Sequence, residues 1–231
     1  MTRRIASLKF WVALAILLAN AGASHGQAKQ DQGFHPHLRA AVAHISWIQR
    51  DGAPVHIDAL AQTTDGYLWI GSPLGLYRFN GVQLAAYPLT PLDTPLPYSD
   101  VESLAADQQG GLWIGFRLGG ITHLARDGAV TNYNRRNGRG PAEVQKLMCR
   151  SDGSVWALGD GKLIVLRNGH WQSFGVDHGL PNDELYTFYF DRKGSLWTAA
   201  RQKVFVLKKT EKTFALYPMK SFAVAPTCIC K

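Results

Sequence analysis

The chain has 231 residues, of which 46% are hydrophobic, so it can form the packed core of one large domain or two small ones and need not be disordered. Its formal net charge is +8, but Arg3, Arg4 and Lys9 lie in a segment predicted to be removed, which leaves 22 Lys and Arg against 17 Asp and Glu. This mild positive charge gives no indication of nucleic-acid binding, and the densest basic run, residues 134–139, is predicted to be a solvated loop.

The N-terminus has the features of a signal peptide over residues 1–23. Arg3 and Arg4 precede an apolar stretch at residues 10–19, and small residues follow at 21–23. The apolar stretch is shorter than the roughly 20 residues that span a bilayer, and no later segment comes close, so no membrane helix is expected after signal removal. We expect cleavage after Ala23 or Ala28, a linker over residues 24–41, and a periplasmic or secreted mature protein.

Tryptophan recurs along the rest of the chain with spacings of 44, 43 and 41 residues, which marks an internal repeat. A glycine stands three positions before each tryptophan, and a large apolar residue stands nine positions before it. The residues at these three positions are Trp69, Trp113, Trp156 and Trp197; Gly66, Gly110, Gly153 and Gly194; and Leu60, Leu104, Leu147 and Phe188. Their fixed spacing predicts a structural role in the core of every repeat.

The first repeat predicts four antiparallel strands joined by tight turns, at residues 57–62, 67–71, 76–79 and 82–87. The dipeptides Asp65-Gly66 and Asn80-Gly81 tolerate the positive φ of hairpin turns. Because Leu68, Trp69 and Ile70 are apolar on both faces of the second strand, the sheet must lie between neighbouring sheets. A repeat of about 42 residues with four strands therefore predicts an all-β fold, a β-propeller of four-stranded antiparallel blades.

Four blades account for residues 50–217, with expected bounds of 50–88, 89–134, 135–175 and 176–217. We interpret residues 42–49, which include Trp47, as an orphan outer strand of the kind that closes a propeller, and residues 218–231 as the stub of a fifth blade. Propellers commonly have four to eight blades, and seven at this period would need roughly 290 residues. We therefore expect a truncated, incomplete propeller. A self-closing ring of four blades and completion by a second chain are the alternatives, since unpaired edges favour self-association or pairing with another propeller fragment.

The similarity to a known family is concentrated in the first repeat. This repeat contains Asp65-Gly66-Tyr67-Leu68-Trp69-Ile70-Gly71 and then Gly75-Leu76-Tyr77-Arg78-Phe79-Asn80-Gly81, and it resembles the two-component regulator propeller repeat. Gly179-Leu180-Pro181-Asn182 is similar to the inter-blade linker of that family, and the resemblance covers residues 45–217. It implies the extracytoplasmic sensor part of a histidine kinase, hybrid regulator or diguanylate cyclase, many of which are associated with carbohydrate sensing. No kinase or cyclase signature follows Tyr217, so a ligand-sensing module without its output domain is expected.

A ligand is expected on the face where the inter-blade loops meet the turns between second and third strands. Side chains suited to a small molecule or an oligosaccharide, including a carboxylated one, are found there at Tyr98, Arg117, Arg139, His178, Asp183 and Arg201. No cofactor is expected, and no metal site, because His35, His37, His44 and His56 are separated residues predicted to face solvent. Cys228 and Cys230 lack further ligand pairs, and Cys149 is predicted to be a buried small apolar residue.

Two other functions remain open. Propeller lyases and hydrolases that act on glycans or lactones place catalytic side chains on separate loops, so the lack of a nucleophile-elbow, zinc-helix or phosphate-loop motif does not exclude them. Carboxylates that could serve such an enzyme are Asp58, Asp100, Glu143, Asp183 and Glu184. The chain could also be a protein-binding or non-functional fragment. We expect a binding module and not an enzyme.

Overall fold

The computed structural model describes residues 45–88 and 100–218 of the chain. These residues belong to two units, one ending at Val55 and one beginning at His56. The predicted signal peptide and linker (1–41) lie outside the described residues, as does the predicted fifth-blade stub beyond residue 218.

The first unit does not contain the predicted outer strand over its described residues. Residues 45–48 form no regular element, and a 3-10 helix, η2, spans Gln49–Asp51. The backbone N–H of Ile48 donates to Oδ2 of Asp51 at 3.0 Å, and Gly52 N–H donates to the carbonyl of Gln49 at 3.1 Å. The prediction of a strand is therefore wrong for residues 45–49, where a local 3-10 turn forms at Gln49–Asp51; residues 42–44 lie outside the described residues.

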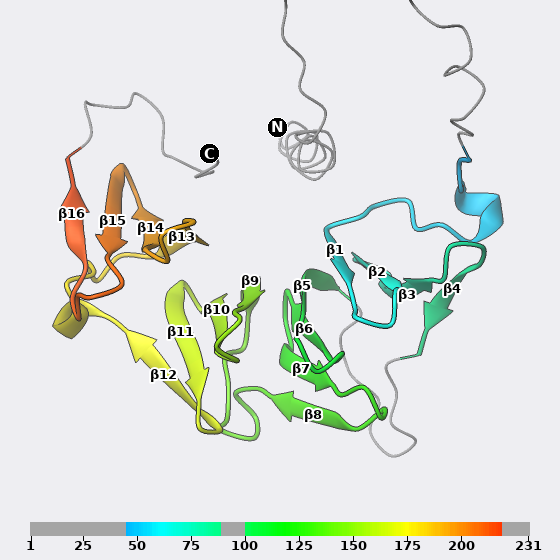
Figure 1. Cartoon of the computed structure of the whole chain (residues 1–231), viewed down its shortest axis with the longest axis horizontal. Coiled ribbons are helices and arrows are strands. Elements are labelled where there is room, and N and C mark those ends of the chain that lie inside the picture. Colours follow the sequence, from blue (N-terminus) through cyan, green and yellow to red (C-terminus); the bar gives the residue numbers. More distant parts are fainter. Residues whose placement is uncertain (1–44, 89–99, 219–231) are drawn as a thin grey trace, which may run out of the picture. The chain divides into compact units, whose positions relative to one another are not determined.

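The described residues of the second unit form four antiparallel sheets, each of four strands, which confirms the predicted all-β propeller architecture (Figure 1). The strands of the first two sheets are β1 (Ala59–Gln62), β2 (Leu68–Ser72), β3 (Gly75–Phe79) and β4 (Leu84–Tyr87), then β5 (Val101–Ala106), β6 (Leu112–Phe116), β7 (Gly120–Leu124) and β8 (Val130–Tyr133). Those of the last two are β9 (Val144–Cys149), β10 (Val155–Gly159), β11 (Lys162–Arg167) and β12 (His170–Phe174), then β13 (Leu185–Phe190), β14 (Leu196–Ala200), β15 (Lys203–Leu207) and β16 (Ala215–Tyr217). Strand order follows the sequence in every sheet, so each sheet is a meander.

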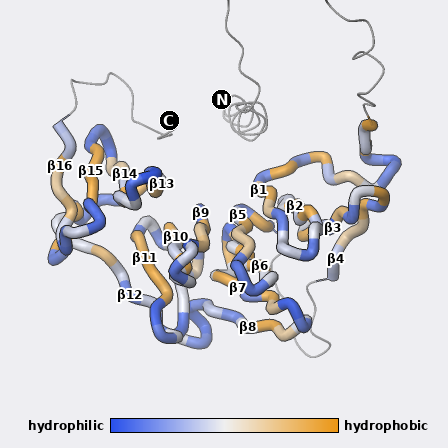
Figure 2. The backbone as a smooth tube through the Cα atoms, in the orientation of Figure 1, coloured by the Kyte–Doolittle hydropathy of each residue, from blue (hydrophilic) through white to orange (hydrophobic). Residues whose placement is uncertain are grey.

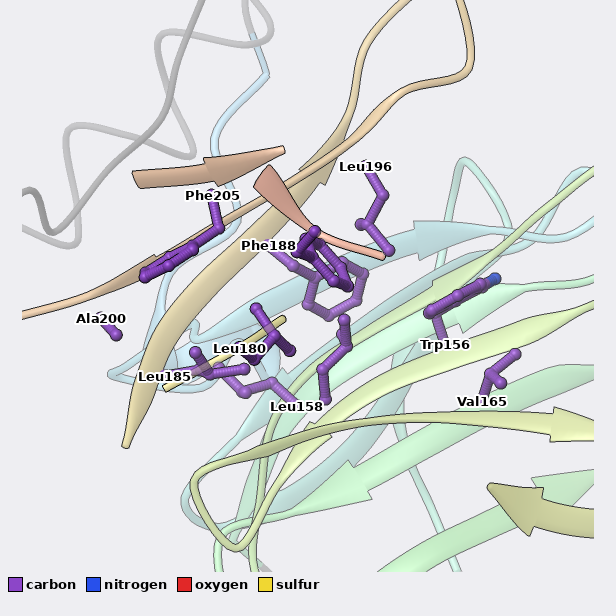
Figure 3. Close-up of a cluster of buried hydrophobic side chains, with 11 residues drawn as sticks. Trp156, Leu158, Val165, Leu180, Leu185, Phe188, Leu196, Ala200 and Phe205 are labelled. Carbon is purple, nitrogen blue, oxygen red and sulfur yellow. The ribbon is translucent and has the colours of Figure 1, made fainter. Parts of the chain in front are cut away.

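Consecutive sheets pack through their first and second strands: β1 contacts β5, β5 contacts β9, and β10 contacts β13. A buried cluster fills the space between the last two sheets, where Trp156 and Leu158 of β10 meet Phe188 of β13 (Figure 3). Figure 2 shows the same division along the chain, with hydrophobic residues on strands such as β11 and β15 and hydrophilic residues at the hairpin turns. The core is therefore divided among the interfaces between sheets.

The repeated tryptophans of the first and third sheets are fixed by hydrogen bonds as well as by burial. Trp69, Trp113 and Trp156 are 5%, 6% and 4% exposed. The indole Nε1 of Trp69 donates to Oγ1 of Thr63 at 2.9 Å, and that of Trp156 donates to Oγ of Ser154 at 3.0 Å. Trp69 and Trp156 are thus buried without leaving their polar N–H groups unpaired.

The helical segments of the described chain are short 3-10 turns: η2 and η3 (Val176–His178). Within residues 45–88 and 100–218, no helix has the length and apolar character needed to cross a membrane.

Candidate functional site

The turns between second and third strands lie at the same end of the sheets as the inter-blade loops, and they are bonded to them. In an antiparallel meander these two kinds of connection fall on one side, and the structure adds direct contacts. Arg117 N–H donates to the carbonyl of Asp100 at 2.9 Å, and Asp160 N–H donates to the carbonyl of Glu143 at 3.1 Å. We name this end of the second unit the loop face.

On the loop face, Arg117 is held by acidic residues. Its Nε lies 2.7 Å from Oδ2 of Asp100, and its Nη2 lies 2.5 Å from Oε2 of Glu102. Burial lowers the pKa of Arg117, but the carboxylates of Glu102, Asp100 and Asp58 together raise it above its ordinary value. The guanidinium therefore fastens the β6–β7 turn to the loop before β5, and its charge is already balanced.

Within the described residues, the same three acidic side chains are close enough together to act as metal ligands. One oxygen from each of Asp58, Asp100 and Glu102 lies within 4.8 Å of the others. Such oxygen ligands suit Ca²⁺ or Mg²⁺. Arg117, however, already contacts two of the three carboxylates, so the group is explained as an ion-pair network. Two of the carboxylates considered for catalysis, Asp58 and Asp100, are thus brought together. Asp100 is paired with Arg117, so it is not free to act as an acid or base.

In the fourth sheet an ion pair joins the corresponding turn and loop. Arg201 Nη2 lies 3.1 Å from Oδ1 of Asp183. Arg201 has φ of +49°, a left-handed conformation that a long side chain rarely adopts. Asp183 and Arg201 are the pair of predicted ligand residues that the structure brings into contact.

His178 lies in a structural position. It ends η3, and its carbonyl accepts a hydrogen bond from Phe214 N–H at 2.7 Å. Its ring lies 4.8 Å from the ring of Phe174. The half-buried imidazole therefore supports the loop between the third and fourth sheets.

A β-bulge places one extra side chain near the start of the first strand in the last three sheets. The strand register skips Glu102, Gln145 and Tyr186, because their neighbours on either side pair with consecutive residues of the second strand. Tyr186 is 43% exposed and Gln145 is also exposed. Sequence reasoning missed this position, although it is marked by varying polar residues directly after the apolar Val101, Val144 and Leu185.

A hollow of about 830 Å³ lies beside Arg139, between the second and third sheets. It begins at the loop face and continues between outer strand β8 and the β11–β12 hairpin. Its lining includes a group of cationic and aromatic side chains: Arg135, Arg139, Lys162, His170, Tyr133 and Trp171. The indole Nε1 of Trp171 is buried and has no hydrogen-bond partner among the described residues.

The loop that carries two of the arginines is internally bonded. Asn137 N–H donates to Oδ1 of Asn134 at 3.0 Å, and its Nδ2 donates to the carbonyl of Asn132 at 2.8 Å. Arg139 N–H in turn donates to the carbonyl of Asn134 at 3.2 Å. The sequence predicted a solvated loop here; its side chains are indeed exposed, but its backbone is fixed and holds the arginines at the rim of the hollow.

Positive charge predominates in this hollow. Arg135 Nη2 contacts Oδ2 of Asp160 at 2.9 Å, and Asp160 also accepts hydrogen bonds from the backbone N–H groups of Ala142 and Glu143. Arg139 and Lys162 are exposed and form no ion pair with a described residue. The arrangement can therefore offer two uncompensated cations and aromatic surface to an anionic ligand.

Of the six predicted ligand residues, Arg139 is the one that lines the hollow. Arg117, Asp183 and Arg201 form ion pairs between turns and loops, His178 packs against Phe174, and Tyr98 lies outside the described residues. The lining residues that sequence reasoning missed include Tyr133 on β8, Lys162 on β11, and His170 and Trp171 on β12. The one sequence feature that could have pointed to these residues is the dense basic run at residues 134–139, which lines the same hollow.

No protein-family model and no curated protein matches the chain. Among solved structures, the chain is similar to the extracellular domain of a protein assigned to a hybrid two-component system in B. thetaiotaomicron, with 22% identity and a TM-score of 0.61. It is also similar to YCF48 from Cyanidioschyzon merolae (8% identity, TM-score 0.56) and to virginiamycin B lyase from Staphylococcus aureus (14% identity, TM-score 0.52).

These alignments cover 73%, 73% and 70% of this chain and 24%, 59% and 55% of the three structures, so the chain spans about a quarter of the first one's length. At these identities the similarity concerns the fold. The chain therefore has the β-propeller fold of that extracellular domain, with four consecutive blades over its described residues.

Proposed function

We propose that the chain is the ligand-binding propeller of an extracytoplasmic sensor of the two-component type, and that its ligand is a carboxylated small molecule or oligosaccharide. The observation that carries this proposal is the hollow beside Arg139. Its volume of about 830 Å³ lies in the range of roughly 300–1,000 Å³ that is typical of ligand sites.

The chemistry of the lining selects the ligand class. Arg139 offers a planar fork of donors that matches a carboxylate, and Lys162 adds a second cation nearby in the lining. Tyr133 and Trp171 supply aromatic rings of the kind that pack against the apolar face of a sugar ring. A neutral sugar could use the rings, but an acidic sugar would also use both cations.

The role in a sensor is supported by the fold shared with the extracellular domain from B. thetaiotaomicron. Export across the membrane belongs to the same proposal and depends on the predicted signal peptide. Ligand sensing by such a module requires that a bound ligand stabilise one arrangement of the blades, which then biases an output domain.

The lyase or hydrolase alternative is less well supported by the described carboxylates. A general acid needs a pKa raised towards the working pH. Asp100, Glu102, Asp160 and Asp183 are each bound to an arginine.

A thermal-shift comparison tests the proposal. We expect trigalacturonic acid to raise the melting temperature of the chain in a concentration-dependent way, whereas the neutral trisaccharide maltotriose should have little effect. Equal shifts with both sugars, or no shift with either, would contradict the proposed ligand class. Release of shorter products from trigalacturonic acid during the same incubation would favour the enzyme alternative.

A further inference from the structure

The first sheet exposes a face that is buried in every other sheet. The residue nine positions before the tryptophan packs against the preceding sheet: Leu104, Leu147 and Phe188 are 8%, 5% and 0% exposed. Leu60, at the same position of the first sheet, is 37% exposed. Ile57 repeats the pattern, since it is also 37% exposed while its equivalents Val101 and Val144 are fully buried.

The fourth sheet exposes the opposite face. Trp69, Trp113 and Trp156 are buried by the sheet that follows each of them, whereas Trp197 is only half-buried. Tyr217, which lies beside Trp197, is 46% exposed. The rings of Trp197 and Tyr217 are 5.0 Å apart at 70°, close to the 4.9 Å and 78° of Trp69 and Tyr87. The exposed face of β14–β16 therefore has the geometry of the face of the first sheet that packs against β5 and β6.

The chain thus displays the two different halves of its own inter-sheet interface. We call the face of a sheet that carries its repeated tryptophan the tryptophan face, and the face that carries the apolar residue nine positions earlier the leucine face. Each internal interface joins the tryptophan face of one sheet to the leucine face of the next, as Trp69 joins Leu104 in one cluster. The tryptophan face of the fourth sheet and the leucine face of the first sheet should therefore fit each other, because the same two kinds of face meet at every internal interface. Exposed apolar faces of this kind mark interaction surfaces.

We infer that a second copy of this chain covers these faces, with Trp197 and Tyr217 of one copy packed against Leu60 and Ile57 of the other. The contact is head-to-tail, so it closes into a ring only when the last free faces also meet. Two copies would bring together eight sheets, which is within the usual range of four to eight blades for a propeller. A face-to-face dimer would instead place Trp197 against Trp197, a contact that no internal interface contains.

The mass of the purified chain in solution, measured by light scattering during size exclusion at about 1 and about 50 µM, tests this inference. We expect the unmodified chain to be a dimer at the higher concentration and the Leu60→Glu and Trp197→Glu chains to be monomers. Val82→Glu is the matched control, because Val82 is 78% exposed in the β3–β4 turn, and this variant should remain dimeric. Tyr217→Glu provides a second variant of the tryptophan face if Trp197→Glu does not fold, as judged by near-ultraviolet circular dichroism.

Mixing the variants distinguishes the two kinds of dimer. The Leu60→Glu chain keeps an intact tryptophan face and the Trp197→Glu chain keeps an intact leucine face, so an equimolar mixture should form dimers that neither chain forms alone. Dimers of Leu60→Glu alone would show a face-to-face contact and overturn the inference. A chain that stays monomeric at both concentrations would overturn it as well, as expected if further blades of a longer polypeptide take these faces.

Discussion

The indole Nε1 of Trp197 donates a hydrogen bond to Oδ2 of Asp191 across 3.0 Å, and the backbone N–H of Ser195 donates to Oδ1 of the same carboxylate at 2.8 Å. The bond from Trp197, followed by those from Ser195, lowers the pKa of Asp191 below 3.8, while burial acts in the opposite direction. Thr63 holds Trp69 in the same way in the first sheet. The tryptophan and the turn that precedes its strand are thus one structural unit.

This hydrogen bond predicts a pH dependence of stability. Because the pKa of Asp191 is lower in the folded chain, its contribution is complete above the ordinary carboxyl pKa of 3.8 and is lost as the pH falls through the folded value. Asp191→Asn keeps an acceptor for Trp197 but cannot titrate. We expect its melting temperature to fall less than that of the unmodified chain between pH 5 and pH 2.5. Asp177→Asn, at an exposed position, should follow the unmodified chain.

The thiol of Cys149 should be unreactive in the folded chain. Burial, with a smaller effect from Asp107, raises its pKa from 9.0 to about 12. At pH 8 the thiolate population is then roughly a thousand-fold lower than in the unfolded chain. With Cys228 and Cys230 replaced by serine, we expect iodoacetamide to label Cys149 quickly only after guanidinium unfolding. Equal labelling rates in the folded and unfolded chains would show that the thiol is not buried.

The same shift predicts that the folded chain loses stability in alkali. A thiol with a raised pKa stabilises the folded state fully below pH 9 and progressively less as the pH rises towards 12. Cys149→Ala should remove this part of the alkaline loss, which urea titrations at pH 8 and pH 10.5 can measure.

Gly120 should resist substitution more strongly than another glycine of similar conformation. Gly120 and Gly128 have φ of +83° and +90°, so alanine at either one costs about 1–2 kcal/mol for the left-handed backbone. A Cβ at Gly120 would in addition collide with the backbone carbonyl of Tyr133, whereas Gly128 faces open space. We expect Gly120→Ala to lower the free energy of unfolding by at least about 1 kcal/mol more than Gly128→Ala, as measured by urea denaturation. Equal losses would show that the loop after β8 is not held at this position.

Two leucines at the same repeat position should differ in their contribution to stability. Leu147 is 5% exposed between the second and third sheets, and Leu60 is 37% exposed on the first sheet. Leu147→Ala should cost about 2–5 kcal/mol, and Leu60→Ala about 1 kcal/mol when measured at nanomolar concentration. Similar costs would mean that the face of the first sheet is covered within the single chain.

The repeat pattern was sufficient to predict most of the fold, because tryptophan and glycine at fixed spacing show where each sheet lies in the sequence. It did not locate the start of β1, which begins at Ala59 and not at residue 57. In the other sheets the position corresponding to Asp58 is a bulge, and its varying polar residues were not used because the repeat was traced from tryptophan, glycine and apolar positions.

The site was less predictable, because charge pairing depends on contacts that are distant in sequence. Arg117 reaches Asp100, 17 residues earlier, and Arg201 reaches Asp183 across a similar separation. Both arginines were predicted to contact ligand, but loop position alone does not show that a neighbouring loop neutralises them. Trp171 was missed because its position on an outer strand indicates core packing; its ring does lie edge-on to those of Trp113 and Tyr133, but the residue also lines the hollow.

Isothermal titration of trigalacturonic acid into the unmodified chain, Arg139→Ala and Arg192→Ala tests the central claim most directly. Arg192 is an exposed arginine outside the hollow and serves as the matched control. A charge-assisted hydrogen bond contributes about 1.5–3 kcal/mol, so Arg139→Ala should weaken binding by about tenfold or more, while Arg192→Ala should leave it unchanged. The same affinity in all three chains would contradict the account, because the ligand would then bind somewhere other than the hollow beside Arg139.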